Sequence, residues 1–482
     1  MPISVNSIDL ENFKSFQKES LKLNSLTVLI GPNGSGKTNF LEGVKLAFSV
    51  ADYGTPIDNP FLPFWGYSNA VYNYDDKNYI GFKIDFTIEN FQITYELKFT
   101  GRGGLLNFLE ETISLKNYLE IKRRGSKLSI EYSKHFFDRI LKDGWILNEL
   151  SEEITSRKLS TNKTRNRPKK FSINQTYDGI DPSRSIFLEV PLFPMTIYRK
   201  SKEKDDYSLM FINLPINSRS KGPSRNTIPV VSPVIKGRKS RSGALLDDFP
   251  IFFLYSIFGR DYTSSSIRFS KSTNDTERSV IFIRHDSIYG MKRPVPINYA
   301  LEGTINGERA VLWLFKYFTG HAGKVPDRIQ SAIEDLFPGW QLSFKTTEDG
   351  NIILQVSETD RFENILCILP PSLPDGFFKL VLILTAVEMN PTILLIDEIE
   401  NSLHESILDY LIDSLRDSHI TTIITTHSPL VVNNVELSEI RILEREANGT
   451  KIKMINKPEE MKRKLLDMGI TPSDFWLYGE IA

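Results

Sequence analysis

The sequence predicts an α/β fold in which a mainly parallel sheet, covered by helices, is assembled from both ends of the chain. Two observations carry this prediction. An apolar run at residues 26–30 leads directly into a glycine-rich turn and a helix, which is the strand–loop–helix order of a phosphate-binding unit. From residue 376 onward, apolar strand-like runs alternate with helical patterns, and such alternation indicates a parallel sheet.

Composition limits the class of protein. The 482 residues, 40% of them hydrophobic, suffice for one or two sizeable cores. The net charge of −1 predicts no overall field that would attract nucleic acid or a membrane. The opening residues lack the apolar core of a signal peptide, and no apolar run is long enough to span a bilayer. We therefore expect a soluble, cytoplasmic protein without a membrane partner.

The single cysteine, Cys367, excludes an intrachain disulfide and a cysteine-based metal site. Its neighbours at 365, 366, 368 and 369 are all apolar. These neighbours predict a buried structural thiol in a reducing compartment.

Local patterns predict strands first and helices later. Residues 3–30 are expected to form two strands around a turn. Alternating residues at 78–97 predict an antiparallel hairpin or meander, and those at 118–132 a further hairpin. Further along the chain, the expected helices are 306–318 and 326–336, and a return to strand is expected at 340–356.

These patterns divide the chain into three parts. Residues 1–150 are expected to form an N-terminal lobe with the phosphate loop and a β-meander, 151–295 an insert, and 296–482 a C-terminal lobe. Within the insert, the stretches 157–170 and 217–242 together hold fourteen basic and no acidic residues. The remainder of the chain therefore carries a net charge of −15. The two stretches are interpreted either as a surface that follows a DNA backbone or as solvated loops.

The phosphate-loop pattern is the strongest motif. Residues 31–38 fit G-x-x-x-x-G-K-[ST], with a strand before and a helix after them. Glycines let backbone N–H groups turn toward phosphates, and the helix directs its positive end to the same anions. Lys37 is expected to reach the β- and γ-phosphates, and Thr38 to bind Mg²⁺. A chance glycine-rich turn is the alternative. The expected nucleotide-binding residues are Gly31, Pro32, Asn33, Gly34, Ser35, Gly36, Lys37, Thr38 and Asn39.

Two later strands end in residues suited to catalysis. The apolar run 391–396 ends in Asp397, expected to hold Mg²⁺, and Glu398, expected to polarise the attacking water as general base. Taken alone, this segment has a less favoured alternative, a buried strand that ends in a solvated acidic turn. The run 421–426 delivers His427 to the edge of the sheet where ligands bind. We expect His427 to hydrogen-bond the γ-phosphate, although a lone histidine is usually structural.

Together these motifs resemble the RecF/SMC/OLD branch of ABC-type ATPases. The similar segments are IDLENFKSF, GPNGSGKTNFLEGV, LLIDEIENSLH and TTHSP, and the similarity covers roughly 1–130 and 300–482. The resemblance implies an ABC-type P-loop ATPase head, ATP and Mg²⁺ as cofactors, and a homodimer with ATP held between two heads. It also implies that residues 400–404 form a D-loop that crosses to the second subunit. The 55 residues after His427 are too few for the TOPRIM domain of OLD nucleases, so no built-in nuclease is expected.

The segment that matches the family signature departs from the usual pattern. Residues 372–376 read SLPDG, so Pro374 replaces the signature serine and lacks both a hydroxyl and an N–H donor. Gly376 remains and is expected to contact the nucleotide of the partner head. The departure implies slow hydrolysis or a looser dimer. No Q-loop glutamine is assigned, because Gln92 lies on an expected strand.

The resemblance implies an ATP-hydrolysing protein that dimerises on ATP and associates with DNA in chromosome organisation or repair. Two alternatives remain open. One is the ATPase subunit of an anti-phage defence system, similar to Septu-type ATPases, that regulates a separate nuclease. The other is a weakly catalytic, ATP-dependent scaffold, which Pro374 favours.

Overall fold

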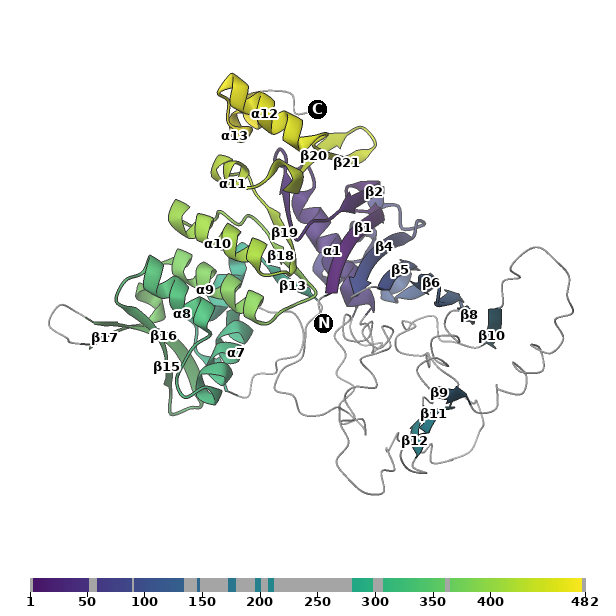
Figure 1. Ribbon diagram of the computed structural model, residues 1–482, viewed down its shortest axis with the longest axis horizontal. Helices are drawn as coiled ribbons and strands as arrows, with labels where there is room; N and C mark the ends of the chain where they lie inside the picture. The colour runs from purple at the N-terminus through teal and green to yellow at the C-terminus, as the bar shows by residue number, and fades with distance from the viewer. Residues whose placement is uncertain are drawn as a thin grey trace, which may run out of the picture. The chain divides into compact units, whose positions relative to one another are not determined.

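The computed structural model describes residues 3–51, 59–88, 91–133, 145–147, 172–178, 196–200, 207–211, 280–297, 307–359 and 365–478 (Figure 1). The chain divides into two compact units. Unit 1 comprises Met1–Phe48 and Thr276–Ala482, and unit 2 comprises Ser49–Asp275. Unit 1 therefore combines the two ends of the chain in one α/β structure, as the sequence predicted.

A six-stranded sheet in the order β13-β18-β19-β3-β20-β21 forms the centre of unit 1. β3, from the N-terminal segment, lies between β19 and β20, from the C-terminal segment, and runs parallel to both (Figure 1). Every residue of β3 is buried, which explains its unbroken apolar sequence. The strands are β3 (Leu26–Ile30), β13 (Val280–Ile283), β18 (Ile393–Ile396), β19 (Thr421–Thr425), β20 (Ile440–Glu446) and β21 (Gly449–Met454).

Helices cover both faces of this sheet. Alternate residues of β3, beginning with Leu26, join a hydrophobic core with side chains of α7 to α11. α1 (Lys37–Ala51) lies on the opposite face, where Nζ of Lys45 is 5.6 Å from the centroid of the Phe282 ring in β13. The other helices of unit 1 are α7 (Gly307–Gly320), α8 (Asp327–Leu336), α9 (Asp375–Glu388), α10 (Glu405–Asp417), α11 (Pro429–Asn434), α12 (Pro458–Met468) and α13 (Pro472–Tyr478). Both helices predicted before residue 340 are thereby confirmed.

Residues 3–30 form three strands, so the prediction of two was wrong. β1 (Ile3–Phe13) and β2 (Phe16–Lys22) make an antiparallel hairpin before β3. β2 escaped prediction because only Phe16 and Leu21 of its seven residues are buried. The amide of Val5 donates to Oγ1 of Thr421, which joins β1 to β19.

A smaller antiparallel sheet follows α8. The stretch 340–356, predicted as strand, forms most of a hairpin of β15 (Trp340–Thr346) and β16 (Asn351–Thr359). The short strands β14 (Val295–Pro296) and β17 (Ile365–Ile368) both pair with β16.

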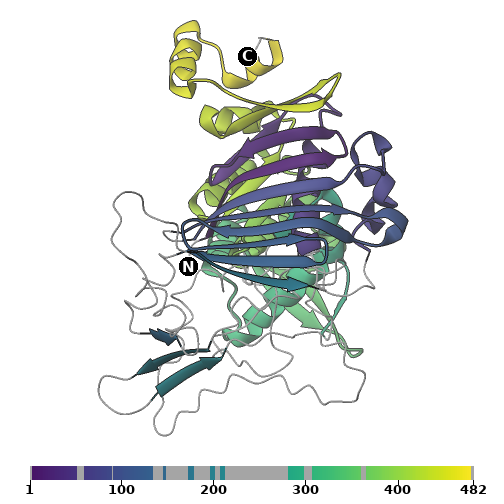
Figure 2. The same ribbon diagram turned by 90° about the vertical axis from the view of Figure 1, so that its right-hand side faces the viewer.

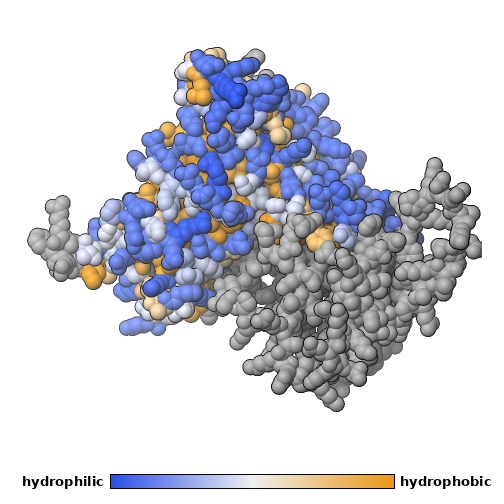
Figure 3. Space-filling model, viewed as in Figure 1, coloured by the Kyte–Doolittle hydropathy of each residue, from blue (hydrophilic) through white to orange (hydrophobic). Residues whose placement is uncertain are grey.

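Cys367 is exposed, which contradicts the prediction of a buried thiol. It lies on β17, where Ile365 and Leu366 are 72% and 59% exposed. Figure 3 shows hydrophobic surface at the β15–β17 end of unit 1. The apolar run around Cys367 is therefore a short strand at a sheet edge and not part of the core, a difference that apolar composition alone does not reveal.

Unit 2 contains an antiparallel meander in which β4, β5, β6, β7, β8 and β10 follow one another in space (Figure 2). Both predicted hairpins are confirmed, with β6 between them. Glu111 and Arg123 form a fully buried ion pair of 2.7 Å across β6 and β7. The strands are β4 (Ile80–Ile88), β5 (Phe91–Thr100), β6 (Asn107–Leu115), β7 (Leu119–Arg124), β8 (Lys127–Ser133) and β10 (Ser172–Asp178), and a separate sheet holds β9 (Trp145–Leu147), β11 (Thr196–Lys200) and β12 (Tyr207–Phe211).

The two units do not follow the boundaries expected at residues 150 and 295. β13 and the helical turn η6 (His285–Lys292) precede residue 296 yet belong to unit 1, because β13 pairs in parallel with β18. The basic stretches 157–170 and 217–242 lie outside the described residues. Among the residues that are described, no helix is both long and apolar enough to cross a membrane.

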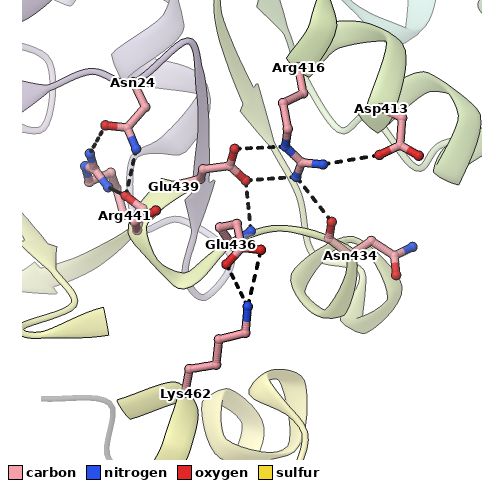
Figure 4. Close-up of polar contacts among 9 residues, drawn as sticks. Asn24, Asp413, Arg416, Asn434, Glu436, Glu439, Arg441 and Lys462 are labelled. Carbon is pink, nitrogen blue, oxygen red and sulfur yellow. Dashed lines mark hydrogen bonds and ion pairs between the residues drawn. The ribbon is translucent and has the colours of Figure 1, made fainter. Parts of the chain in front are cut away.

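Polar contacts hold the C-terminal helices to the sheet of unit 1 (Figure 4). Arg416, at the end of α10, donates Nε and Nη2 to the two carboxylate oxygens of Glu439 at 3.1 and 3.0 Å. Glu439 also accepts the backbone N–H of Glu436, whose own carboxylate binds Nζ of Lys462 in α12 at 3.0 Å. Arg416 makes a second ion pair with Asp413 at 3.2 Å.

We expect Glu439→Ala to lower the free energy of unfolding by about 2 kcal/mol, since hydrogen bonds to charged groups each contribute roughly 1.5–3 kcal/mol. Asp413→Ala is the matched control: it removes the other partner of Arg416, and Asp413 is 76% exposed. That loss is expected to be about 0–1 kcal/mol. Chemical denaturation followed by tryptophan fluorescence measures both losses, and equal losses would mean that the Glu439 contacts stabilise the fold no more than an exposed ion pair does.

Candidate functional site

The loop between β3 and α1 needs its glycines for conformation and for space. Gly31, Gly34 and Gly36 have positive φ angles of 150°, 77° and 106°, which side chains other than glycine rarely adopt. A Cβ at Gly31 would lie 2.2 Å from the carbonyl oxygen of Leu443, and one at Gly36 would lie 2.7 Å from Oγ1 of Thr450. The positive φ angles and the close contacts with Leu443 and Thr450 therefore both require glycine in this phosphate loop.

β21 and the β1–β2 turn hold this loop in place. Oγ1 of Thr450 donates to the carbonyl of Ser35 at 2.8 Å, and the amide of Thr450 donates to the carbonyl of Ser15 at 2.7 Å. Nδ2 of Asn39 donates to Oγ of Ser15 at 3.1 Å, so Asn39 has a supporting contact. Neither Ser15 nor Thr450 was predicted at the site. Ser15 lies inside the motif IDLENFKSF, whereas Thr450 carries no sequence signal.

Lys37 is 5% exposed. Its Nζ donates to the carbonyls of Gly31 and Pro32 at 2.8 and 3.2 Å. Burial lowers the pKa of Lys37 to about 8, while the nearby carboxylates, Asp397 foremost, oppose the shift. The ammonium is thus charged at neutral pH and is held by carbonyls that a phosphate can replace. Oγ of Ser35 is also buried and has no partner among the described residues.

The two predicted metal ligands lie together, although 359 residues separate them. Oγ1 of Thr38 is 3.1 Å from each carboxylate oxygen of Asp397. Oγ1 of Thr425 donates to Oδ1 of Asp397 at 2.7 Å. Burial raises the pKa of Asp397, and the Thr425 and Thr38 hydroxyls oppose that shift. A hydroxyl and a carboxylate are hard oxygen donors, and Mg²⁺ typically takes one or two such protein ligands and completes its shell with phosphate and water. These residues therefore fit Mg²⁺.

Glu398 follows Asp397 in an unusual conformation. Its φ is 49°, in the left-handed region that residues other than glycine seldom occupy. Its amide donates to Oγ1 of Thr425 at 2.8 Å, and its Oε2 accepts Nδ2 of Asn401 at 2.5 Å. The general-base candidate is thereby attached to β19 through Thr425 and to the D-loop segment, residues 400–404, through Asn401.

His427 follows β19 and is joined to the D-loop segment through its backbone. Its amide donates to Oε1 of Glu400 at 2.6 Å. Burial, and then Lys37, lower the pKa of His427, while Glu400 and the other carboxylates oppose the shift. The neutral imidazole therefore prevails at neutral pH and is able to donate one hydrogen bond.

Gly376 packs closely against the D-loop segment, residues 400–404. A Cβ there would lie 2.6 Å from the carbonyl oxygen of Ser402 and 3.8 Å from a side-chain carbon of Leu403. The glycine thus allows α9 to approach the D-loop segment closely. Pro374 is the exposed N-cap of α9 and provides no capping side-chain hydrogen bond.

Two further residues organise the site and were not predicted there. Thr425 contacts both Asp397 and Glu398; its signal is a threonine in a strand whose residues are all buried. Lys379 of α9 is fully buried, and its Nζ donates to main-chain carbonyls of the acidic segment. Its signal is a lysine within the otherwise apolar run 377–384 of that helix.

Comparisons with known proteins find two family models that match parts of this chain. Residues 4–228 match the family model described as "AAA ATPase domain", and residues 312–433 match that described as "AAA domain, putative AbiEii toxin, Type IV TA system". The chain is 49% identical over 43 residues to the chromosome partition protein Smc of Methanococcus voltae. It is 47% identical over 47 residues to the DNA replication and repair protein RecF of Rickettsia conorii.

These matches to single proteins are short. They cover 9% of this chain and 4% of Smc, and 10% of this chain and 13% of RecF. Among solved structures, an Smc head bound to the C-winged helix domain of ScpA aligns over 95% of this chain and 100% of its own, with 11% identity and a TM-score of 0.41. Because that score is low, the fold assignment rests on the strand order and the motif geometry above.

We expect Lys37→Met to weaken ATP binding at least about 100-fold, because it removes charge-assisted hydrogen bonds that contribute roughly 1.5–3 kcal/mol each. The matched control is Lys18→Met, which removes an exposed lysine on β2. Isothermal titration calorimetry gives both affinities. Parental affinity in the Lys37 variant would refute the assignment of the loop.

Proposed function

The chain belongs to the RecF/SMC branch of ABC-type ATPases, and from this premise we propose that it binds Mg²⁺·ATP at the phosphate loop and hydrolyses it. The observation that carries the proposal is a chain of contacts among the predicted site residues. Asp397 contacts Thr38, and Thr425 contacts both Asp397 and Glu398. Segments from the two ends of the chain thus supply one set of nucleotide, metal and water-activating groups.

Each residue has a distinct part in the proposed reaction. Lys37 exchanges its loop carbonyls for the β- and γ-phosphates, and Thr38 and Asp397 hold Mg²⁺. The metal supplies neutralising charge to the phosphates when bound. Glu398 accepts a proton from the attacking water; Asn401 holds its Oε2, so Oε1 is the oxygen available to the water. His427 donates a hydrogen bond to the γ-phosphate as a neutral imidazole.

Hydrolysis should depend on Glu398. Glu398→Gln keeps the shape and loses the base, so turnover is expected to fall by roughly 10²–10⁴-fold with ATP affinity retained. Glu405→Gln, at an exposed acidic residue of α10, is the control and should leave turnover unchanged. Phosphate release measures both, and undiminished turnover in Glu398→Gln would reject the proposed base.

We extend the proposal to a dimer in which ATP joins two heads. The signature-like segment 372–376 and the D-loop segment 400–404 of one copy then face the nucleotide of the other, and two-fold symmetry closes the assembly. Light scattering of Glu398→Gln with ATP should report a dimer. A strict monomer at tens of micromolar would mean that Pro374 disables the signature or that another chain is the partner.

We propose further that the chain associates with DNA through the basic stretches 157–170 and 217–242. If about six of their cations contact phosphates, log K should fall with log salt with a slope of about −5. Neutralising the basic residues of the first stretch should weaken duplex binding and flatten that slope. The residues changed are Lys163, Arg165, Arg167, Lys169 and Lys170. Fluorescence anisotropy measures the slope; affinity that ignores these changes would exclude this surface.

A second candidate function is that of an ATPase subunit in a defence system. It is favoured by the match of residues 312–433 to a family model described by a toxin of a Type IV toxin–antitoxin system. Turnover that does not respond to duplex DNA, together with duplex affinity that is absent at low salt, would favour this candidate over the chromosomal one.

A further inference from the structure

Lys379 places a charge where the fold has no apparent need of one. It lies on α9, the helix that begins at the signature-like segment, and its side chain is fully buried. Its Nζ donates to the carbonyl of Glu398 at 2.7 Å and to that of Asn401 at 3.1 Å. Burial lowers the pKa of Lys379 to about 8, opposed by Glu400, Glu398 and Asp397. A buried ammonium is costly, so a role beyond packing is expected of it.

The backbone that Lys379 contacts is strained. Glu398 has a φ of 49°, and a residue with a side chain in this region costs of order 1–3 kcal/mol unless its surroundings enforce it. Three groups hold Glu398 in this conformation. Thr425 accepts its amide, and its carbonyl accepts both Nζ of Lys379 and the amide of Asn401. The direction of the Glu398 carboxylate depends on this conformation, because a relaxed φ would turn the side chain away.

We propose that Lys379 is a positioning residue for Glu398: it fixes the peptide after the general base and the adjoining D-loop to α9, and so keeps the carboxylate aimed at the attacking water. The inference rests on the proposed role of Glu398 in ATP hydrolysis. Because α9 begins at Asp375, within the signature-like segment 372–376, the same lysine connects the base to that segment. Lys379 acts through Glu398, because its Nζ donates to main-chain carbonyls of the acidic segment.

The test separates kcat from nucleotide affinity. Lys379→Met keeps the volume and removes the donor, and we expect kcat to fall at least about 10-fold while the ATP affinity from calorimetry stays within about 2-fold. Lys379→Arg, which keeps a cation and donors, should retain more turnover than Lys379→Met. The matched control is Lys45→Met, at another largely desolvated lysine of unit 1, on α1, which should leave kcat unchanged.

A double variant tests whether Lys379 acts through Glu398. In the Glu398→Gln background, Lys379→Met should lower the residual turnover no further, because residues that act as a unit are not additive. A multiplicative further loss, or parental kcat in Lys379→Met alone, would overturn the inference. If Glu398→Gln itself retains parental turnover, the proposed function fails instead. Circular dichroism and ATP binding verify folding; should Lys379→Met fail to fold, Lys379→Gln is judged by the same outcomes.

Discussion

The parallel pairing of β3 with β19 and β20 is the constraint on which the rest of the structure depends. Parallel strands direct their carboxyl ends to one edge of a sheet, and ligands of open α/β sheets bind at that edge. The neighbouring strands β18, β19 and β3 therefore end side by side, and they are followed by Asp397, by the residues after Thr425 and by Gly31. The hydrogen bond between Thr38 and Asp397 is therefore a consequence of strand order, and so is the site.

A second constraint acts at the level of single peptides. The chain must turn sharply after β18 to aim Glu398, and it does so in a left-handed conformation that four hydrogen bonds to its amide, carbonyl and carboxylate hold in place. These hydrogen bonds involve three residues from three different segments of the chain: Thr425, Asn401 and Lys379. Such enforcement typifies functional sites, where strain persists because the surroundings over-determine it. The acidic segment is thus rigid where proton transfer needs a fixed direction.

The sequence predicted those parts of the site that motifs carry. The phosphate loop, the acidic strand end and the histidine were each identified from residue types in a strand–loop context, and the structure brings the first two into contact. The sequence could not reveal Thr425 or Thr450. A threonine in a strand does not indicate its hydrogen-bond partner, and these contacts join separate segments of the chain. Lys379 was visible only as a polar residue in an apolar helix, without the carbonyls that explain it.

For the fold, too, the sequence predicted some elements and missed others. β3 was evident from an unbroken apolar run, whereas β2 was hidden because only two of its residues are buried. β13, a four-residue apolar strand, was assigned to the insert, since nothing in its sequence reveals that it pairs with β18. Cys367 was misplaced for the converse reason: its apolar neighbours cover a sheet edge and not a core. For β13 the missing information was a partner strand far away in the sequence. β2 and β17 pair with strands next to them in the chain, and there the missing information was burial.

A double-mutant cycle of Thr38→Ala and Asp397→Asn tests whether the two ends of the chain form one shared Mg²⁺·ATP site. The quantity measured is the Mg²⁺ dependence of ATP affinity, by calorimetry at fixed ionic strength. A shared site predicts that each single variant removes most of the Mg²⁺ dependence and that the double variant removes little more, because both residues serve one ion. Strictly additive losses, or Mg²⁺ dependence that survives in both single variants, would contradict it.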